Sequence, residues 1–252
     1  MKRLLVAGLV LACLAAPAQD ARRSGFEDMS PATQAMQRDD ALNPAMLWVR
    51  EGQALWQRAE GAANKSCAAC HGAAEQSMRG VAARYPALDA RSQGPINLAQ
   101  RINQCREQRQ QASPWRAESP ELLSLESYLA LQSRGQPIAP PADARLAPHV
   151  QAGQALYRQR LGQLNLSCAQ CHDERAGQRL GGTPIPQAHP TAYPLYRLEW
   201  QSVGSLQRRL RNCMNGVRAQ LYPFNAQELV QLELYLMERA RGMPLESPGV
   251  RP

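Results

Sequence analysis

Histidine and aromatic side chains are scarce in this sequence. The 252 residues include only 4 His, 4 Trp, 7 Tyr and 2 Phe. Proteins that bind nucleic acid usually carry clustered positive charge, often with interleaved aromatic residues, whereas the net charge of +8 is scattered along this chain. We therefore exclude nucleic-acid binding, and we expect the positive charge to favour anions or an acidic partner instead.

Long apolar runs are also lacking after residue 18. A basic start is followed by an apolar run from Leu4 to Ala16, and Ala16-Pro17-Ala18 has the small residues of a cleavage site. Because the run is too short to span a membrane, residues 1–18 are predicted to be a secretory signal peptide. An uncleaved anchor, or lipidation at Cys13, is the alternative. We expect a soluble protein without a membrane span, exported to the periplasm.

Beyond Cys13 the chain has six cysteines, and four of them lie in two copies of one motif. The motif reads CAACH at 67–71 and CAQCH at 168–172. C-x-x-C-H is the attachment signature of c-type haem, in which two thiols form thioethers with the haem and the histidine binds the iron. Further Cys or His residues at the spacing of a zinc finger are lacking. The sequence therefore predicts two covalently bound haem c groups. The predicted attachment and iron-binding residues are Cys67, Cys70, His71, Cys168, Cys171 and His172.

These motifs belong to an internal repeat. GQALWQRAEGAANKSCAACH (52–71) matches GQALYRQRLGQLNLSCAQCH (153–172) without a gap, and ELLSLESYLALQSRGQP (121–137) matches ELVQLELYLMERARGMP (228–244). A duplicated unit is the simplest interpretation. The predicted domains are an N-terminal domain over 19–135, a Pro-rich linker over 136–148 and a C-terminal domain over 149–252.

Each copy is expected to be helical, which makes the fold class mainly α. Apolar residues recur at helical spacing in both closing segments, and we expect these helices to end at Gly135 and Gly242. Gly52 and Gly153 would let each closing helix approach the opening helix. This order of elements resembles the class I cytochrome c fold, so we predict two tandem class I cytochrome c-like domains. The expected core residues are Leu122, Leu125, Tyr128, Leu129, Leu229, Leu232, Tyr235 and Leu236.

Haem iron in such domains takes a second axial ligand, most often methionine. Met78 and Met214 have no counterparts in the other copy, whereas Cys105 matches Cys213. Each of these cysteines lies seven positions after the first apolar residue of a predicted middle helix, which places it on the apolar side of that helix. Each should therefore face the haem. We predict thiolate ligation of two haems by Cys105 and Cys213. A disulfide between them, or ligation of the second haem by His189, is the alternative.

An arginine-rich stretch surrounds Cys213. The first copy reads LAQRINQCREQRQ and the second reads LQRRLRNCMNGVR, so Arg101 matches Arg209. Arginine favours the thiolate form of a nearby thiol and binds oxyanions through paired N–H donors. The stretch therefore predicts chemistry on a small sulfur oxyanion, although a single arginine is equally typical of a solvated helix face. The arginines particular to the second copy are Arg208, Arg211 and Arg218.

Taken with these motifs, the sequence resembles SoxA, the dihaem subunit family of the SoxAX cytochrome complex of bacterial thiosulfate oxidation. The resemblance covers nearly all of the chain after the signal peptide. It is carried by QRDDALNPAMLWVREGQALW (37–56), both haem motifs, INLAQRINQCREQRQ (96–110), ESPELLSLESYLALQSRGQPI (118–138) and RRLRNCMNGVR (208–218).

The resemblance implies an L-cysteine S-thiosulfotransferase that joins thiosulfate to a cysteine of the sulfur carrier SoxYZ. Cys213 would be haem ligand and active-site cysteine, and Arg209 would bind thiosulfate, with Arg218 as a second substrate-binding candidate. Electrons would pass to the monohaem partner SoxX, which forms a heterodimer with this chain, and then to a soluble cytochrome c. The alternatives are a plain dihaem electron carrier and a thiosulfate dehydrogenase that makes tetrathionate.

Overall fold

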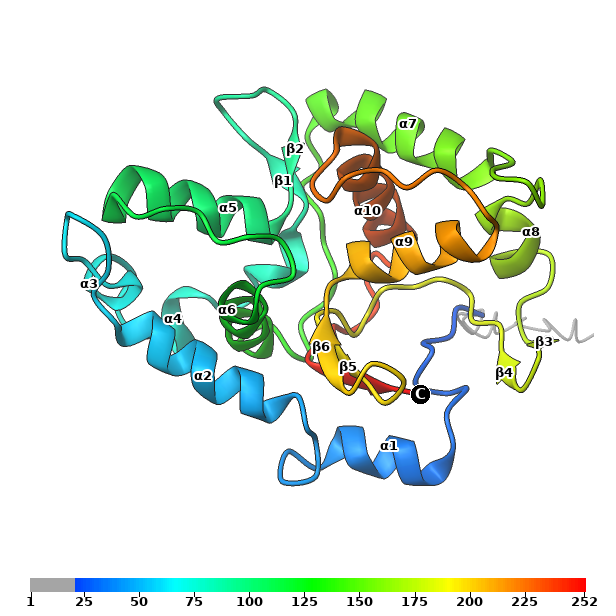
Figure 1. Ribbon diagram of the computed structural model, residues 1–252, viewed down its shortest axis with the longest axis horizontal. Helices are drawn as coiled ribbons and strands as arrows, with labels where there is room; N and C mark the ends of the chain where they lie inside the picture. The colour runs from blue at the N-terminus through cyan, green and yellow to red at the C-terminus, as the bar shows by residue number, and fades with distance from the viewer. Residues whose placement is uncertain (1–20) are drawn as a thin grey trace, which may run out of the picture.

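The computed structural model describes residues 21–252, and it is mainly helical (Figure 1). The predicted signal peptide and Cys13 lie outside the described residues. Among residues 21–252, no helix has both the length and the apolar character needed to cross a membrane. Two copies of a small helical unit follow a first helix, α1 (Pro31–Arg38), which confirms the predicted fold class.

The first copy runs from α2 to α6. Its elements are α2 (Met46–Gln57), α3 (Cys67–His71), α4 (Ala74–Ser77), the 3-10 helix η1 (Ala82–Arg84), β1 (Ala87–Leu88), β2 (Pro95–Ile96), α5 (Leu98–Cys105), the π-helical turn η2 (Arg106–Gln110) and α6 (Pro120–Leu131).

The second copy repeats this order and adds strands. Its elements are the 3-10 helix η3 (Ala144–Leu146), α7 (Ala147–Arg158), α8 (Cys168–His172), β3 (Arg179–Leu180), β4 (Thr183–Pro184), β5 (Leu195–Arg197), β6 (Ser202–Gly204), α9 (Leu206–Gly216), α10 (Gln227–Arg239) and β7 (Gly249–Arg251). The β5–β6 pair corresponds to β1–β2, and β7 joins it in parallel with β5.

Opening and closing helices cross closely in both copies. In Figure 1, α2 lies against α6 and α7 lies against α10. A Cβ atom at Gly52 would overlap the backbone carbonyl of Ser124, and one at Gly153 would overlap that of Gln231. Only glycine allows such close approach of two backbones, so the predicted role of both glycines is confirmed.

The closing helices carry the two cores, as the periodicity predicts, but they end earlier than expected. All eight predicted core residues are at most 8% exposed. Helix α6 ends at Leu131 and α10 ends at Arg239. Tight turns then lead to Gly135 and Gly242, which have left-handed φ angles of 79° and 84°. These glycines therefore end the turns after the helices rather than the helices themselves.

The copies are joined about an approximate two-fold axis. Gly135 N–H donates to the Leu245 carbonyl, and the equivalent Gly242 N–H donates to the Ile138 carbonyl, at 2.7 and 2.8 Å. Ile138 is fully buried. The start of the predicted linker is thus paired with the matching segment of the second copy, as expected for two halves that exchange the same contacts.

The segment before α2 lies on the second copy rather than the first. Asn43 donates to the Pro248 carbonyl at 3.0 Å, and Gln37 accepts from Val250 N–H at 2.9 Å. Ser24 contacts Thr191 through their hydroxyls. The domain division at 135 and 149 stays a prediction, but these contacts associate residues 24–43 with the C-terminal half.

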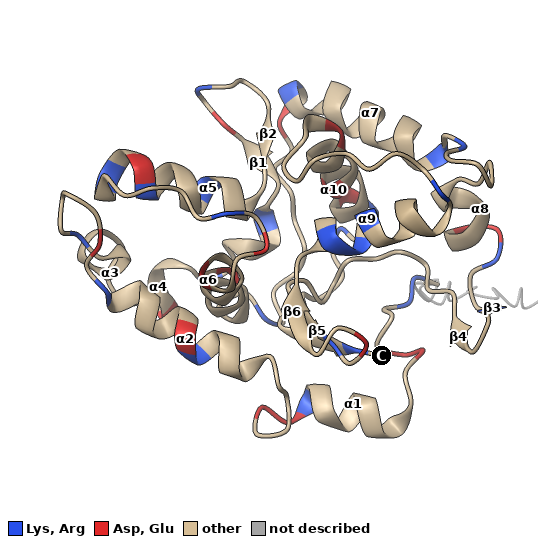
Figure 2. Cartoon of the chain, viewed as in Figure 1, with Lys and Arg blue, Asp and Glu red and all other residues tan. Residues whose placement is uncertain are grey.

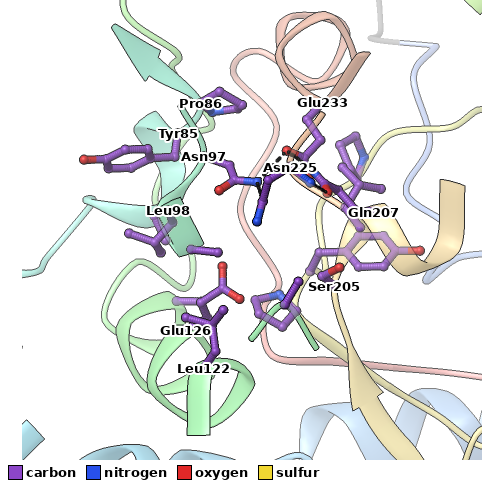
Figure 3. A pocket seen from close by; sticks show the side chains of 18 of the residues that line it. Tyr85, Pro86, Asn97, Leu98, Leu122, Glu126, Ser205, Gln207, Asn225 and Glu233 are labelled. Carbon is purple, nitrogen blue, oxygen red and sulfur yellow. Dashed lines mark hydrogen bonds between the residues drawn. The ribbon is translucent and has the colours of Figure 1, made fainter. Parts of the chain in front are cut away.

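A cavity between the copies is lined by Glu118, Glu126 and Glu233, among other residues. Figure 3 shows Glu126 and Glu233 there. Glu233 accepts hydrogen bonds from Asn97 at 3.1 Å and Gln207 at 3.2 Å. Burial raises the pKa of Glu233 to about 7, and raises the pKa of Glu126 and of Glu118 as well. The junction therefore favours neutral carboxyl groups.

Candidate functional site

The haem motif of the second copy forms a single capped turn, α8. The Ser167 hydroxyl accepts from Gln170 N–H at 3.2 Å, and the Gln170 side chain accepts from Ser167 N–H at 2.9 Å. This capping box begins the helix just before the motif. Cys168 and Cys171 are three residues apart and therefore lie on one face of the turn. In the first copy Ser66 caps α3 in a similar way.

His172 is held in a defined orientation beside that turn. Its Nδ1 lies 2.7 Å from the carbonyl oxygen of Pro186. Burial lowers the pKa of His172, which favours the neutral imidazole. An imidazole that donates from Nδ1 to a backbone carbonyl has Nε2 available for a metal. His71, by contrast, is exposed, and its ring lies 5.8 Å from that of Trp56.

Helix α9 brings Cys213 and Arg209 to the same cavity as His172. Ser205 caps the helix by accepting from Arg208 N–H. The cavity encloses about 1000 Å³, its open mouth included. Its largely apolar walls, the imidazoles of His172 and His189 and the half-buried thiol of Cys213 suit a haem with two protein ligands. The apolar lining includes Pro184, Pro186, Leu195, Leu206, Leu210 and Leu236.

The other candidate ligands differ in their surroundings. His189 lines the same cavity, with Nδ1 2.9 Å from the carbonyl oxygen of Arg23, so geometry leaves it as an alternative to Cys213. Met214 is 4% exposed and packs in the core of the second copy, and Met78 packs in that of the first. Among the described residues all six cysteines are free, so the Cys105–Cys213 disulfide is not formed.

The four arginines around Cys213 take different roles. Figure 2 shows the positive charge gathered on α9. Arg208 stacks on Trp200 and donates to Ser202. Arg211 lies over the ring of Phe224 and donates to the Tyr222 carbonyl. Of the four, Arg209 lines the cavity.

Arg218 lies beyond the end of α9. It is exposed, has a φ of 57° and is not among the residues that line the cavity. Its assignment as a substrate-binding residue stays a prediction.

Three charged residues on the cavity wall were missed in the sequence. Arg197 lies on β5, Arg251 on β7 and Asp28 in the segment before α1. Arg251 is bound to Gln37 and Glu246. Burial, followed by the nearby Arg209, lowers the pKa of Arg197. The available signal was the match of Tyr85-Pro86 with Tyr193-Pro194 between the copies, which places Arg197 at the repeat position of Asp89.

The equivalent site of the first copy holds Cys105 at the end of α5. Burial raises the pKa of its thiol, while Arg101 and Arg109 oppose that rise. Cys67 is half-buried, but Cys70 is exposed. The two sites therefore repeat the same predicted ligand residues and differ in their exposure.

Known proteins with this organisation are similar along nearly the whole chain. The SoxA/TsdA cytochrome c domain matches residues 51–138 and again 152–245. The "L-cysteine S-thiosulfotransferase subunit SoxA" of Pseudaminobacter salicylatoxidans is 35% identical over 90% of this chain and 80% of its own length. The protein of the same name from Rhodovulum sulfidophilum is 34% identical over 92% and 81%.

A solved structure agrees with this relationship. The crystal structure of SoxXA from P. pantotrophus contains a chain that is 32% identical, with a TM-score of 0.88 over 92% of this chain and 87% of that one. The SoxA/TsdA domain is matched twice, and the matching relatives at 34–35% identity carry the SoxA name. The chain belongs to the SoxA family.

Proposed function

We propose that this chain is the SoxA subunit of an L-cysteine S-thiosulfotransferase. The enzyme oxidatively joins thiosulfate to a cysteine of the SoxYZ carrier. The observation that carries the proposal is the convergence of Arg209, Cys213 and His172 on one cavity. A guanidinium for an oxyanion, a thiol and an iron-binding imidazole are the groups that this reaction needs.

Two covalent haems complete the proposed protein. Cys168 and Cys171 would attach the second haem, and His172 and Cys213 would bind its iron. When bound, the haems supply one-electron acceptors close to the reacting sulfur. The first haem would be held in the same way by Cys67, Cys70, His71 and Cys105.

The chemistry of the chain centres on the Cys213 thiolate. Arg209 would hold the thiosulfate dianion beside it, one helical turn away. A bond forms between Cys213 Sγ and the outer sulfur of thiosulfate, and two electrons leave. The thiolate of the carrier cysteine then attacks that same sulfur, and Cys213 departs as thiolate. The carrier retains the S–SO₃⁻ group, so atoms and charge balance over the two steps.

The two electrons removed from thiosulfate and Cys213 need protein acceptors. Electrons would pass to a monohaem SoxX-type subunit in a heterodimer and then to a soluble cytochrome c. With residues 1–18 as a signal peptide, the complex would act in the periplasm.

A product assay tests the proposal. The complex is incubated with thiosulfate and oxidised cytochrome c, with and without SoxYZ, and the carrier cysteine is analysed by mass spectrometry. We expect cytochrome reduction coupled to a thiosulfonate on the carrier cysteine. Tetrathionate formed without SoxYZ would instead identify a thiosulfate dehydrogenase, and no thiosulfate consumption would identify an electron carrier. Acid–acetone extraction should leave two haems per chain.

A further inference from the structure

Asp89 and Arg197 occupy equivalent positions in the two copies. In the first copy Ala87 pairs with Ile96 and Leu88 with Pro95. In the second copy Leu195 pairs with Gly204, Tyr196 with Val203, and Arg197 with Ser202. The next position along β1 is Asp89, whose N–H donates to the Gly94 carbonyl at 2.9 Å. Strand register therefore places an aspartate in one copy where the other has an arginine.

In the first copy that aspartate neutralises the arginine equivalent to Arg209. Arg101 Nη2 lies 3.4 Å from Asp89 Oδ1, and Asp89 is only 2% exposed. Arg101 also donates to the Tyr85 hydroxyl at 3.2 Å and to Gln104 at 2.8 Å. Its charge is thus paired and three of its five N–H donors contact groups of the protein itself, which reduces its capacity for a free anion.

In the second copy, arginine at this position adds a guanidinium group to the cavity wall that already carries Arg209. The other charged residues of that wall have partners, Arg251 in Gln37 and Glu246 and Asp28 in Arg23. Arg197 and Arg209 both line the cavity with Cys213. Arg197 pairs through Nε with Glu199 at 3.0 Å, but that carboxylate is 60% exposed. Within residues 21–252, Arg209 has no ion-pair partner comparable to Asp89. The positive charge of Arg209 adds to burial in lowering the pKa of Arg197, so an anion bound between the two guanidinium groups would stabilise both charges.

We infer that Arg197 is a second substrate-binding residue, which together with Arg209 holds the thiosulfate dianion beside Cys213. The inference rests on the proposed function and extends it. It also accounts for an asymmetry between the two copies, because arginine at this position makes an anion site where aspartate pairs with the neighbouring arginine. The other anion that this pair could hold is a propionate of the haem itself, and the two sources are distinguished experimentally.

The test compares substitutions of Arg197 in the complete haem-loaded complex. Arg197→Gln should reduce kcat/KM for thiosulfate about 10- to 100-fold, the loss typical of a charge-assisted hydrogen bond. Arg197→Lys should recover part of this loss because it keeps the charge but not the planar fork. Arg197→Asp should be the most damaging, because it recreates the Asp89–Arg101 pair of the first copy. Arg158→Gln, an exposed arginine at the end of α7, is the control for removal of one charge.

A binding measurement separates recognition of the anion from turnover. Thiosulfate should raise the melting temperature of the wild-type and Arg158→Gln complexes, since a ligand that binds only the folded state stabilises it. It should not do so for Arg197→Asp. Unchanged haem content and an unchanged melting temperature without thiosulfate establish that a variant is folded. If Arg197→Asp does not fold, Arg197→Lys still tests the inference.

Two results would overturn the inference while leaving the proposed function intact. One is that the wild-type complex transfers thiosulfate to SoxYZ while Arg197→Gln and Arg158→Gln have the same kcat/KM for thiosulfate. The other is a shift in the potential of the second haem in Arg197→Gln without a change in thiosulfate binding, which would assign Arg197 to the propionate. Failure of the wild-type complex to transfer thiosulfate would refute the proposed function itself.

Discussion

Arg209 lies one helical turn before Cys213 on α9, and both line the cavity that also contains His172. Arg208, the neighbour of Arg209, is instead stacked on Trp200 outside that cavity. Two consecutive residues of α9 therefore have different roles: Arg209 is available to an anion in the cavity, and Arg208 packs against Trp200.

Arg209→Lys should impair thiosulfate transfer although it conserves the charge. Lysine lacks the planar fork that contacts two oxygens of one anion. Loss of a charge-assisted contact costs about 1.5–3 kcal/mol, or roughly 10- to 150-fold in kcat/KM. Steady-state kinetics with SoxYZ measure the effect, and Arg158→Lys is the matched control. Equal kinetics for the two variants would remove Arg209 from the substrate site.

Cys213→Ala should abolish transfer while both haems stay covalently attached. The thioethers are made by the C-x-x-C-H cysteines, so Cys213 is not needed for attachment. Haem content is measured after acid–acetone extraction, and transfer by the mass of the carrier cysteine. Asn212→Ala, an exposed neighbour on α9, should behave like the wild type. Near-normal transfer by Cys213→Ala would show that the cysteine is not the nucleophile.

Electron paramagnetic resonance should show low-spin ferric haem of the histidine–thiolate type at both sites. Cys105→Met should alter the first signal alone, because Cys213 lies in the other copy. A bis-histidine signal from the second haem would contradict thiolate ligation. It would point to His189, which lines the same cavity.

Glu233 should make the protein less stable as the pH rises from about 4.5 to about 7. Its pKa is raised to about 7 in the folded protein, so the fold favours the protonated carboxyl. Below the ordinary pKa of 4.5 both states are protonated and nothing is lost. Above it the unfolded chain ionises first, and stability falls by about 3 kcal/mol until the folded pKa is reached.

Glu233→Gln removes this titration. Denaturant unfolding of the haem-loaded protein should show a larger gain over the wild type at pH 8 than at pH 5. Glu228→Gln, at an exposed position of the same helix, should show no such difference. A gain for Glu233→Gln that does not vary with pH would contradict the raised pKa.

The sequence by itself determined the features that are local or repeated. A C-x-x-C-H motif needs only one turn of helix, and its capping serines, Ser66 and Ser167, directly precede it. The two closing helices were readable because their apolar residues recur at the helical period. Gly52 and Gly153 were identified because the repeat places the same small residue at both helix crossings.

Tertiary structure decided everything that depends on distant segments. The sequence presents Arg208, Arg209, Arg211 and Arg218 as one cluster, and only packing against β5, β6 and the loop before α10 assigns Arg209 to the cavity. The segment before α2 lies on the second copy through contacts with residues more than 150 positions later, such as Asn43 with Pro248. Arg197 reaches the site because strand pairing carries it there. Periodicity records which side of an element is buried, but which element buries it depends on contacts that no local pattern encodes.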